Sequence, residues 1–407
     1  MKDKLVTIDN IITIATIFLY SSFFLFEKRT EGRYFLLIFC LIIFLFMSFK
    51  QKGKIYFSIQ EWHKKIIVIA VYSLISAIWA IRPIDSVQKF ITITQILILL
   101  SILYSYYQLE DNAYRLFNII KWGGYFVCIY SIINYGIVLI FKYLLSGIRL
   151  NNDFINVNSI GMLSAISIII ELYEMKYYRK LKKSIIFVLP SFFMILATQS
   201  RKAFFVLLIG IYFILLTNRK SSKKLLKRVI LIIFISLMFI MICFIISKIE
   251  IFKGMTERVM SLMNSIGGEE EIGSSTYIRK QLFEIGWNSF KKNPILGIGI
   301  GCPHVLANKI IDFDAYLHNN YIELLCGGGA IGFILYYYIH FYLIKEFIKY
   351  KNVDYYGKNI SIFFIFISFI MDLGMVSIYS KETYFQFMVL FLCIKHLKIR
   401  YKNYKGK

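Results

Sequence analysis

The chain has 407 residues, of which 58% are hydrophobic, and its formal net charge is +24. A mean hydropathy of +0.63 excludes an ordinary soluble domain, because such a domain could not bury so much apolar surface. Apolar runs of about 17–25 residues recur, which is the length that a helix needs to cross a bilayer. A membrane β-barrel would instead show short segments of alternating hydrophobicity. We therefore expect an all-α polytopic membrane protein with one integral-membrane domain over residues 1–407.

The apolar runs predict twelve transmembrane helices. The first follows a short Met-Lys-Asp-Lys segment that lacks the small-residue cleavage site of a signal peptide, so we expect it to be retained as a span. In chain order, the expected spans are 8–26, 34–49, 66–81, 87–107, 117–141, 158–173, 184–199, 202–217, 229–247, 318–343, 359–377 and 383–397.

Lysine and arginine concentrate in alternate loops. The basic loops lie at residues 50–65, 176–183, 219–228 and 345–358, and the tail 395–407 continues the set. The positive-inside rule places these loops and both termini in the cytoplasm. This distribution accounts for most of the net charge without a nucleic-acid partner, and anionic membrane lipids would suit the inner face.

The remaining loops should face outward, and residues 248–317 form the longest of them. Within this extracytoplasmic loop, Thr276–Phe290 has the periodicity of a short amphipathic helix, with Tyr277 and Phe283 on its apolar face. Asn293-Pro294 should end that helix. No internal repeat is present, which argues against a transporter built from two related halves.

Two histidines, His304 and His318, fall on the outward side. His318 stands where the long loop enters the tenth span, next to Asn319 and close to Glu323. One interpretation is an interfacial residue that marks the helix start. The other is a general base, since imidazole is the side chain best suited to take a proton near neutral pH.

Several arginines also face outward. Arg201 lies in the very short Thr198–Ala203 turn between two spans, where a cation is costly unless it is paired or functional. It could extend to lipid headgroups, and Arg149 and Arg279 could be ordinary solvated charges. Alternatively, these guanidinium groups could grip phosphate oxygens bidentately and stabilise a departing pyrophosphate.

The sequence gives little support for a metal or a cofactor. Asp312-Phe313-Asp314 has the form of a metal-binding D-x-D pair, but two acids in a loop are common. The six cysteines are scattered and no two form a C-x-x-C, so no metal or disulfide framework is predicted.

Three stretches in order resemble the O-antigen ligase and O-antigen/capsular polysaccharide polymerase superfamily, whose members are C-type membrane glycosyltransferases. The resemblance covers roughly residues 142–343. The stretches are an Arg149 segment leading to Asn158-Ser159-Ile160-Gly161, the Ser200-Arg201 turn, and Arg279 to Gly301 followed by His318-Asn319-x-Tyr321-x-Glu323.

The resemblance implies a donor oligosaccharide linked to undecaprenyl diphosphate, with no cofactor. It implies that Arg201 and Arg279 bind the diphosphate and that His318 activates the acceptor hydroxyl. The remaining expected substrate contacts are Arg149, Asn158, Asn319 and Glu323. One departure is Gly327, where the family often has an acid.

The expected function is therefore a polymerase of surface-polysaccharide repeat units in the bacterial cytoplasmic membrane, with its active site facing outward. A chain-length regulator is an expected protein partner. One alternative is a ligase that passes the finished glycan to a different acceptor. Another is a flippase, but it would need polar residues along the middle of several spans, and the predicted spans are almost purely apolar.

Overall fold

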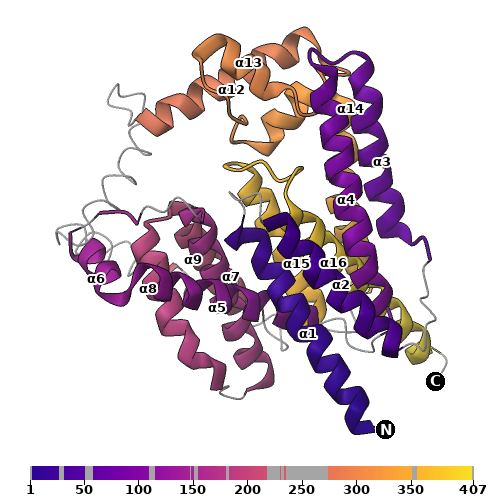
Figure 1. Cartoon of the computed structure of the whole chain (residues 1–407), viewed down its shortest axis with the longest axis vertical. Coiled ribbons are helices and arrows are strands. Elements are labelled where there is room, and N and C mark those ends of the chain that lie inside the picture. Colours follow the sequence, from indigo (N-terminus) through magenta and orange to yellow (C-terminus); the bar gives the residue numbers. More distant parts are fainter. Residues whose placement is uncertain are drawn as a thin grey trace. The chain divides into compact units, whose positions relative to one another are not determined.

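The computed structural model describes residues 2–26, 32–50, 58–109, 115–146, 148–150, 155–179, 183–217, 230, 233–234, 274–350 and 355–405. These residues are helical or lie in turns, and none of them forms a strand (Figure 1). The chain divides into two compact units. Unit 1 comprises residues 1–46 and 114–272, and unit 2 comprises residues 47–113 and 273–407.

Unit 1 is organised around α7 (Val157–Tyr178), which packs against three other helices. Small residues allow these close approaches: a Cβ at Gly161 would meet Thr198 and Ser200, and one at Gly124 would meet Ser167. The other helices are α1 (Lys2–Leu25), α5 (Arg115–Tyr135), α6 (Ile137–Leu145), the 3-10 helix η2 (Lys183–Phe187), α8 (Val188–Thr198) and α9 (Arg201–Leu216), while α2 (Gly32–Lys50) runs from unit 1 into unit 2.

A buried charge cluster joins α5 to α7 inside unit 1. The Lys121 ammonium lies 3.0 Å from a Glu171 carboxylate oxygen and 2.7 Å from one of Glu174, and all three side chains are at most 2% exposed. The Ser184 hydroxyl donates to Glu171 at 2.7 Å. Charges inside a membrane helix pair are tolerated when they neutralise one another in this way.

Unit 2 contains the helices that surround the candidate site. The α3 and α4 helices pack against each other, and α14 packs against α3, α12, α15 and α16. An aromatic cluster of Tyr336, Tyr337, His340, Phe369 and Phe387 fills the space between α14, α15 and α16. The bounds are α3 (Glu61–Ile75), the 3-10 helix η1 (Ser76–Ile78), α4 (Pro83–Tyr107), α12 (Ser274–Lys292), α13 (Pro303–Ile311), α14 (Asn320–Lys349), α15 (Tyr355–Asp372) and α16 (Lys381–Lys405).

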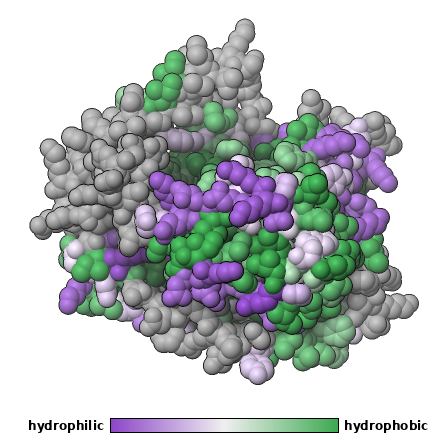
Figure 2. Space-filling model, turned by 90° about the horizontal axis from the view of Figure 1, so that it is seen from above, coloured by the Kyte–Doolittle hydropathy of each residue, from purple (hydrophilic) through white to green (hydrophobic). Residues whose placement is uncertain are grey.

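The predicted all-α membrane protein is confirmed, but twelve spans are not established. Among the described residues, five helices are long and apolar enough to cross a membrane: Ile8–Leu25, Pro83–Tyr107, Arg115–Tyr135, Val157–Tyr178 and Asn320–Lys349. Two shorter apolar helices are Tyr34–Lys50 and Lys183–Thr198. Large apolar side chains also reach the surface, and Figure 2 shows them among polar residues on one face.

One predicted span is divided in the structure, and another cannot be compared with it. The fifth span was expected over 117–141, but α5 ends at Tyr135 because Gly136 has a φ of 77° and starts a separate helix. The predicted ninth span, 229–247, lies almost entirely outside the described residues. The prediction of a single domain remains a prediction.

Candidate active site

The first feature of the site is a break inside α14. Gly329 has φ 61° and ψ −164°, so the helical hydrogen-bond ladder is interrupted there. The break lies roughly 14 Å from the start of the helix. Residues 294–301, here called the pairing segment, supply hydrogen bonds on both sides of it. The bonds run from backbone N–H to carbonyl: Ile298 to Cys326 (3.0 Å), Gly299 to Gly327 (2.9 Å), Ala330 to Pro294 (2.9 Å) and Ile331 to Ile295 (3.3 Å).

Glycine is required where the pairing segment meets α14. Gly297 and Gly329 both have positive φ. A Cβ on Gly297 would collide with the backbone of α14, and a Cβ on Gly329 would collide with the backbone of the pairing segment. Gly327 is packed less tightly than these two glycines, but a Cβ there would still lie 3.1 Å from the Gly299 carbonyl oxygen. This packing gives a physical reason for the absence of an acid at Gly327.

The other side of the pairing segment is fixed by the α3–α4 hairpin. The Ile300 N–H donates to the Ser76 hydroxyl at 3.1 Å, and the Ile300 carbonyl accepts from the Ser86 hydroxyl at 2.8 Å. The Trp79 indole N–H donates to the Leu296 carbonyl at 3.1 Å. Buried backbone polar groups must be satisfied within the protein, and here both sides of the segment are held.

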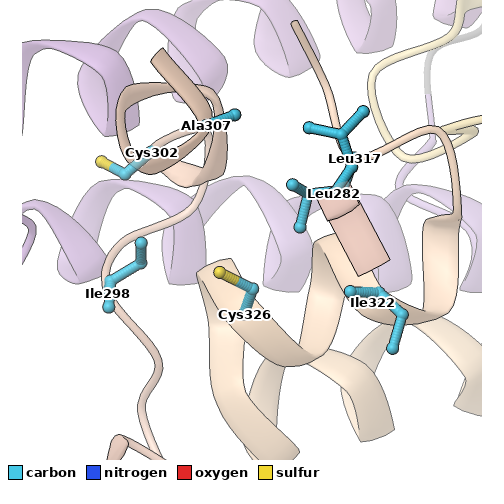
Figure 3. Packing of buried hydrophobic residues seen from close by; sticks show 7 residues of the cluster. All are labelled: Leu282, Ile298, Cys302, Ala307, Leu317, Ile322 and Cys326. Atoms are coloured by element: carbon cyan, nitrogen blue, oxygen red, sulfur yellow. The ribbon is translucent and has the colours of Figure 1, made fainter. Parts of the chain in front are cut away.

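A hydrophobic cluster supports the elements around the site (Figure 3). Leu282 of α12 lies among residues of α13, α14 and the connecting loops, and its side chain is fully buried. Burying an aliphatic side chain of this size contributes ~1.5–3 kcal/mol. The cluster comprises Leu282, Ile298, Cys302, Ala307, Leu317, Ile322 and Cys326.

The predicted amphipathic helix is confirmed as α12, which ends at Lys292 immediately before Asn293-Pro294. Its apolar face is narrower than predicted. Tyr277 and Phe283 are 51% and 44% exposed, whereas Leu282 is buried. The α13 helix was not predicted, because the sequence indicated only a loop around His304.

His318 stands at the start of α14, as predicted. Its backbone is left-handed, with a φ of 54°, and the side chain is half-buried. The next residue, Asn319, caps the helix by accepting a hydrogen bond from the Ile322 N–H at 3.1 Å, and its amide donates to the Leu373 carbonyl at 3.3 Å. A left-handed backbone at a residue other than glycine is costly and is common at functional sites.

Glu323 fixes the turn that carries His318. The Glu323 carboxylate accepts a hydrogen bond from the Leu317 N–H at 3.0 Å, and the side chain is 1% exposed. This contact gives Glu323 a positioning role for the residue just before His318. Its predicted contact with substrate remains a prediction.

Asn320, which the sequence reasoning missed, connects the start of α14 to the loop after α15. Its amide N–H groups donate to Tyr337 and Asp372 at 3.1 Å each, and its carbonyl oxygen accepts from the Ser377 and Ile378 N–H groups at 3.0 and 3.1 Å. A fully buried asparagine with four partners is a strong structural constraint. The sequence feature that could have revealed Asn320 is its position directly after another asparagine, the capping residue Asn319.

Arg279 lies on α12, half-buried, and makes no hydrogen bond or ion pair with any residue that the structure describes. Burial lowers the pKa of its guanidinium below the ordinary value, but arginine stays protonated in proteins. Gly286, two turns later on the same helix face, packs against Leu317 and Ile322. Arg279 is therefore on the side of α12 that faces Leu317 and Ile322, which lie on either side of His318 in the chain.

The sequence-predicted residues of unit 1 also come together. The Arg149 guanidinium donates to the Asn158 side-chain oxygen at 2.6 Å and to the Thr198 carbonyl at 3.1 Å. Arg201 is the first residue of α9, directly after the Ser200 cap. Unit 1 thus gathers Arg149, Asn158 and Arg201, and unit 2 gathers Arg279, His318, Asn319 and Glu323.

His304 is held in one tautomer. Its Nε2 lies 2.9 Å from Arg82 Nη2, and because arginine only donates, Nε2 must accept. Its Nδ1 then carries the proton and donates to the Gly301 carbonyl at 2.7 Å. Arg82 is in turn held by Asp85 at 2.5 and 2.8 Å. The Nε2 of His304 is therefore occupied within the protein.

No group of three side chains within the described ranges could hold a metal ion. Asp314 lies 3.9 Å from His304, but Asp312 does not join this group.

Residues 186–337 match a family model described as O-Antigen ligase. The match contains the Ser200-Arg201 turn, Arg279 and His318. No curated protein matches the chain. The match over these residues supports the expected resemblance to the O-antigen ligase and polymerase superfamily.

Proposed function

We propose that this protein polymerises surface-polysaccharide repeat units. It transfers a glycan from undecaprenyl diphosphate to the terminal sugar of another lipid-linked repeat unit. The family match over residues 186–337 supports an enzyme of the glycosyltransferase type that acts on lipid-linked glycans. The observations that carry the proposal are the position of His318 at the start of α14 and the half-buried Arg279 of α12, which has no partner among the described residues.

His318 acts as the general base. The acceptor hydroxyl gives its proton to the imidazole while its oxygen bonds to the anomeric carbon of the donor sugar. The bond between that carbon and the diphosphate oxygen breaks, and undecaprenyl diphosphate leaves with the electron pair. A positioned base contributes on the order of 10²–10⁴-fold to such a step.

The arginines stabilise the leaving group. Arg279 has all of its donors available toward ligands, and its low solvent exposure strengthens any contact to an anion. The diphosphate contacts expected for Arg149 and Arg201, which belong to unit 1, remain predictions. Arg201 begins α9, where the helix dipole also favours negative charge.

The proposed location is the bacterial cytoplasmic membrane, with both termini in the cytoplasm and this chemistry on the outward face. The support is the concentration of lysine and arginine in alternate loops. On this topology, α12, α13 and the start of α14 face outward, where translocated lipid-linked glycans are found.

A ligase reaction is the second candidate, because the matched family model is described as O-Antigen ligase. The donor chemistry is the same, and only the acceptor differs. A polymerase accepts a second lipid-linked repeat unit, whereas a ligase needs another acceptor.

Reconstitution separates these functions. The full chain in nanodiscs receives labelled lipid-linked repeat units as the sole glycan, and products are separated by size. A ladder of longer lipid-linked glycans supports the polymerase. Release without a ladder, followed by transfer when a different acceptor is added, would favour the ligase instead.

The base is tested in the same assay with His318→Asn and His318→Ala. Asparagine tolerates the left-handed backbone and cannot act as the base, so we expect transfer to fall ~10²–10⁴-fold in both variants. His304→Ala is the matched control and should keep near wild-type transfer, because His304 Nε2 is already bonded to Arg82. A normal ladder from His318→Asn would remove the base from the mechanism.

A further inference from the structure

A groove of about 560 Å³ lies in unit 2 between α12 and α13, two helices that run close together in Figure 1. We call it the α12–α13 groove. Its volume is in the range of sites that hold small organic ligands, about 300–1,000 Å³. None of the sequence-predicted site residues lines it.

One wall of the groove is polar and comes from a single face of α12. Gln281, Glu284, Asn288 and Lys292 recur at spacings of three and four residues, so they project from the same side of the helix. None of these four side chains makes a hydrogen bond or ion pair with a residue that the structure describes. Two amides, a carboxylate and an ammonium group are therefore available to a ligand.

The opposite wall is aliphatic. Leu306 and Ile310 contribute from α13, and Ile81 contributes from the turn before α4. A sugar ring matches this pairing of walls: its hydroxyls donate and accept hydrogen bonds, as amides do, and its C–H face packs on apolar carbon. A polyprenyl chain would leave the four polar side chains unsatisfied, and a phosphate would meet Glu284 as well as Lys292.

The groove is on the opposite side of α12 from Arg279. Arg279 and Asn288 are nine residues apart, which is about two and a half turns of the helix, so their side chains project from opposite sides of α12. A ligand in the groove is therefore separated from the side of α12 that carries the proposed diphosphate contact.

We propose that the α12–α13 groove binds sugar residues of the glycan substrate at a distance from the reacting diphosphate end. This inference rests on the proposed function, since it takes the glycan as the substrate. The groove holds the glycan through the α12 amides and Glu284, while the aliphatic wall packs against the rings.

The test is direct binding without turnover. The probe is the oligosaccharide released by mild acid from the host's own lipid-linked pool, which contains neither lipid nor phosphate. It is titrated against the full chain in nanodiscs and followed by saturation-transfer NMR. We expect binding to wild type and equally to His318→Ala, because the groove is separate from the base.

Variants locate the site. Asn288→Ala and Gln281→Ala should each weaken binding ~3–10-fold, since each removes at least one hydrogen bond. Ile310→Trp should abolish it by filling the groove from a position that is 60% exposed. The matched control is Asn308→Ala, an exposed asparagine of α13 that does not line the groove, and it should bind like wild type.

The outcomes separate this inference from the proposed function. Absence of binding to wild type, or equal binding by Ile310→Trp and wild type, overturns the groove even if transfer proceeds. Binding that depends on Asn288 and Ile310 upholds the groove even if no transfer reaction is detected, in which case only the polymerase proposal fails.

Discussion

Lys121 and Arg149 in unit 1 differ from Arg279 in unit 2 in having partners among the described residues. In unit 1, Lys121 is paired with two glutamates and Arg149 is bonded to Asn158 and a backbone carbonyl. In unit 2, half-buried Arg279 has no partner among the described residues. A satisfied cation contributes to the stability of the fold, whereas an unsatisfied one costs stability and remains available to a ligand.

The sharpest test of the paired state is Lys121→Met. It should lower the free energy of unfolding by ~3–5 kcal/mol, because two carboxylates would stay buried without their cation. Thermal unfolding in detergent measures this loss. The combined variant Lys121→Met, Glu171→Gln, Glu174→Gln should recover most of it, and an unchanged melting temperature for Lys121→Met alone would contradict the ion cluster.

Arg279→Leu tests the unpaired state. We expect transfer to fall by ~10²–10³-fold, equivalent to ~2.7–4 kcal/mol, because a stabilising donor for the leaving group is lost. The melting temperature should not fall, since burial disfavours the charge and lowers the pKa of this guanidinium. Arg279→Lys should still be impaired, because lysine keeps the charge but lacks the planar guanidinium that binds phosphate oxygens bidentately. A fall in stability without a change in turnover would make Arg279 a structural residue.

Asn158→Ala removes one acceptor of Arg149 and should destabilise unit 1 by ~1–3 kcal/mol, because the guanidinium loses a bond of 2.6 Å. Asn158→Asp keeps the acceptor and serves as the control. Equal melting temperatures for Asn158→Ala and Asn158→Asp would show that the hydrogen bond to Arg149 does not support the fold.

The smallest effect is expected for Lys64→Ala. Lys64 pairs with Glu61 at 3.1 Å, but the two side chains are 61% and 48% exposed. Surface pairs contribute ~0.2–0.5 kcal/mol, so the melting temperature should hardly change. If the melting temperature fell as much as in Lys121→Met, burial would not explain the different contributions of the two ion pairs to stability.

Local patterns in the sequence predicted the elements that depend on local forces. The periodicity of α12, its end before Asn293-Pro294, and the position of His318 at a helix start could all be read from neighbouring residues. The family resemblance named Arg149, Asn158 and Arg201 as site residues, but it did not predict the hydrogen bond between Arg149 and Asn158.

Long-range contacts account for what the sequence did not reveal. The break at Gly329 exists because the pairing segment, about 30 residues earlier, supplies hydrogen bonds there. The Lys121 cluster joins residues about 50 positions apart, and no local pattern matches a lysine on one span to glutamates on another.

The break in α14 has a consequence for how the protein is made. The pairing segment precedes α14 in the chain, so its hydrogen-bond partners Cys326 to Ile331 are synthesised after it. Until both have been made, the backbone groups around Gly329 have no partner in the bilayer. The pairing segment is therefore synthesised first, but it can form these hydrogen bonds only after the start of α14 has been made.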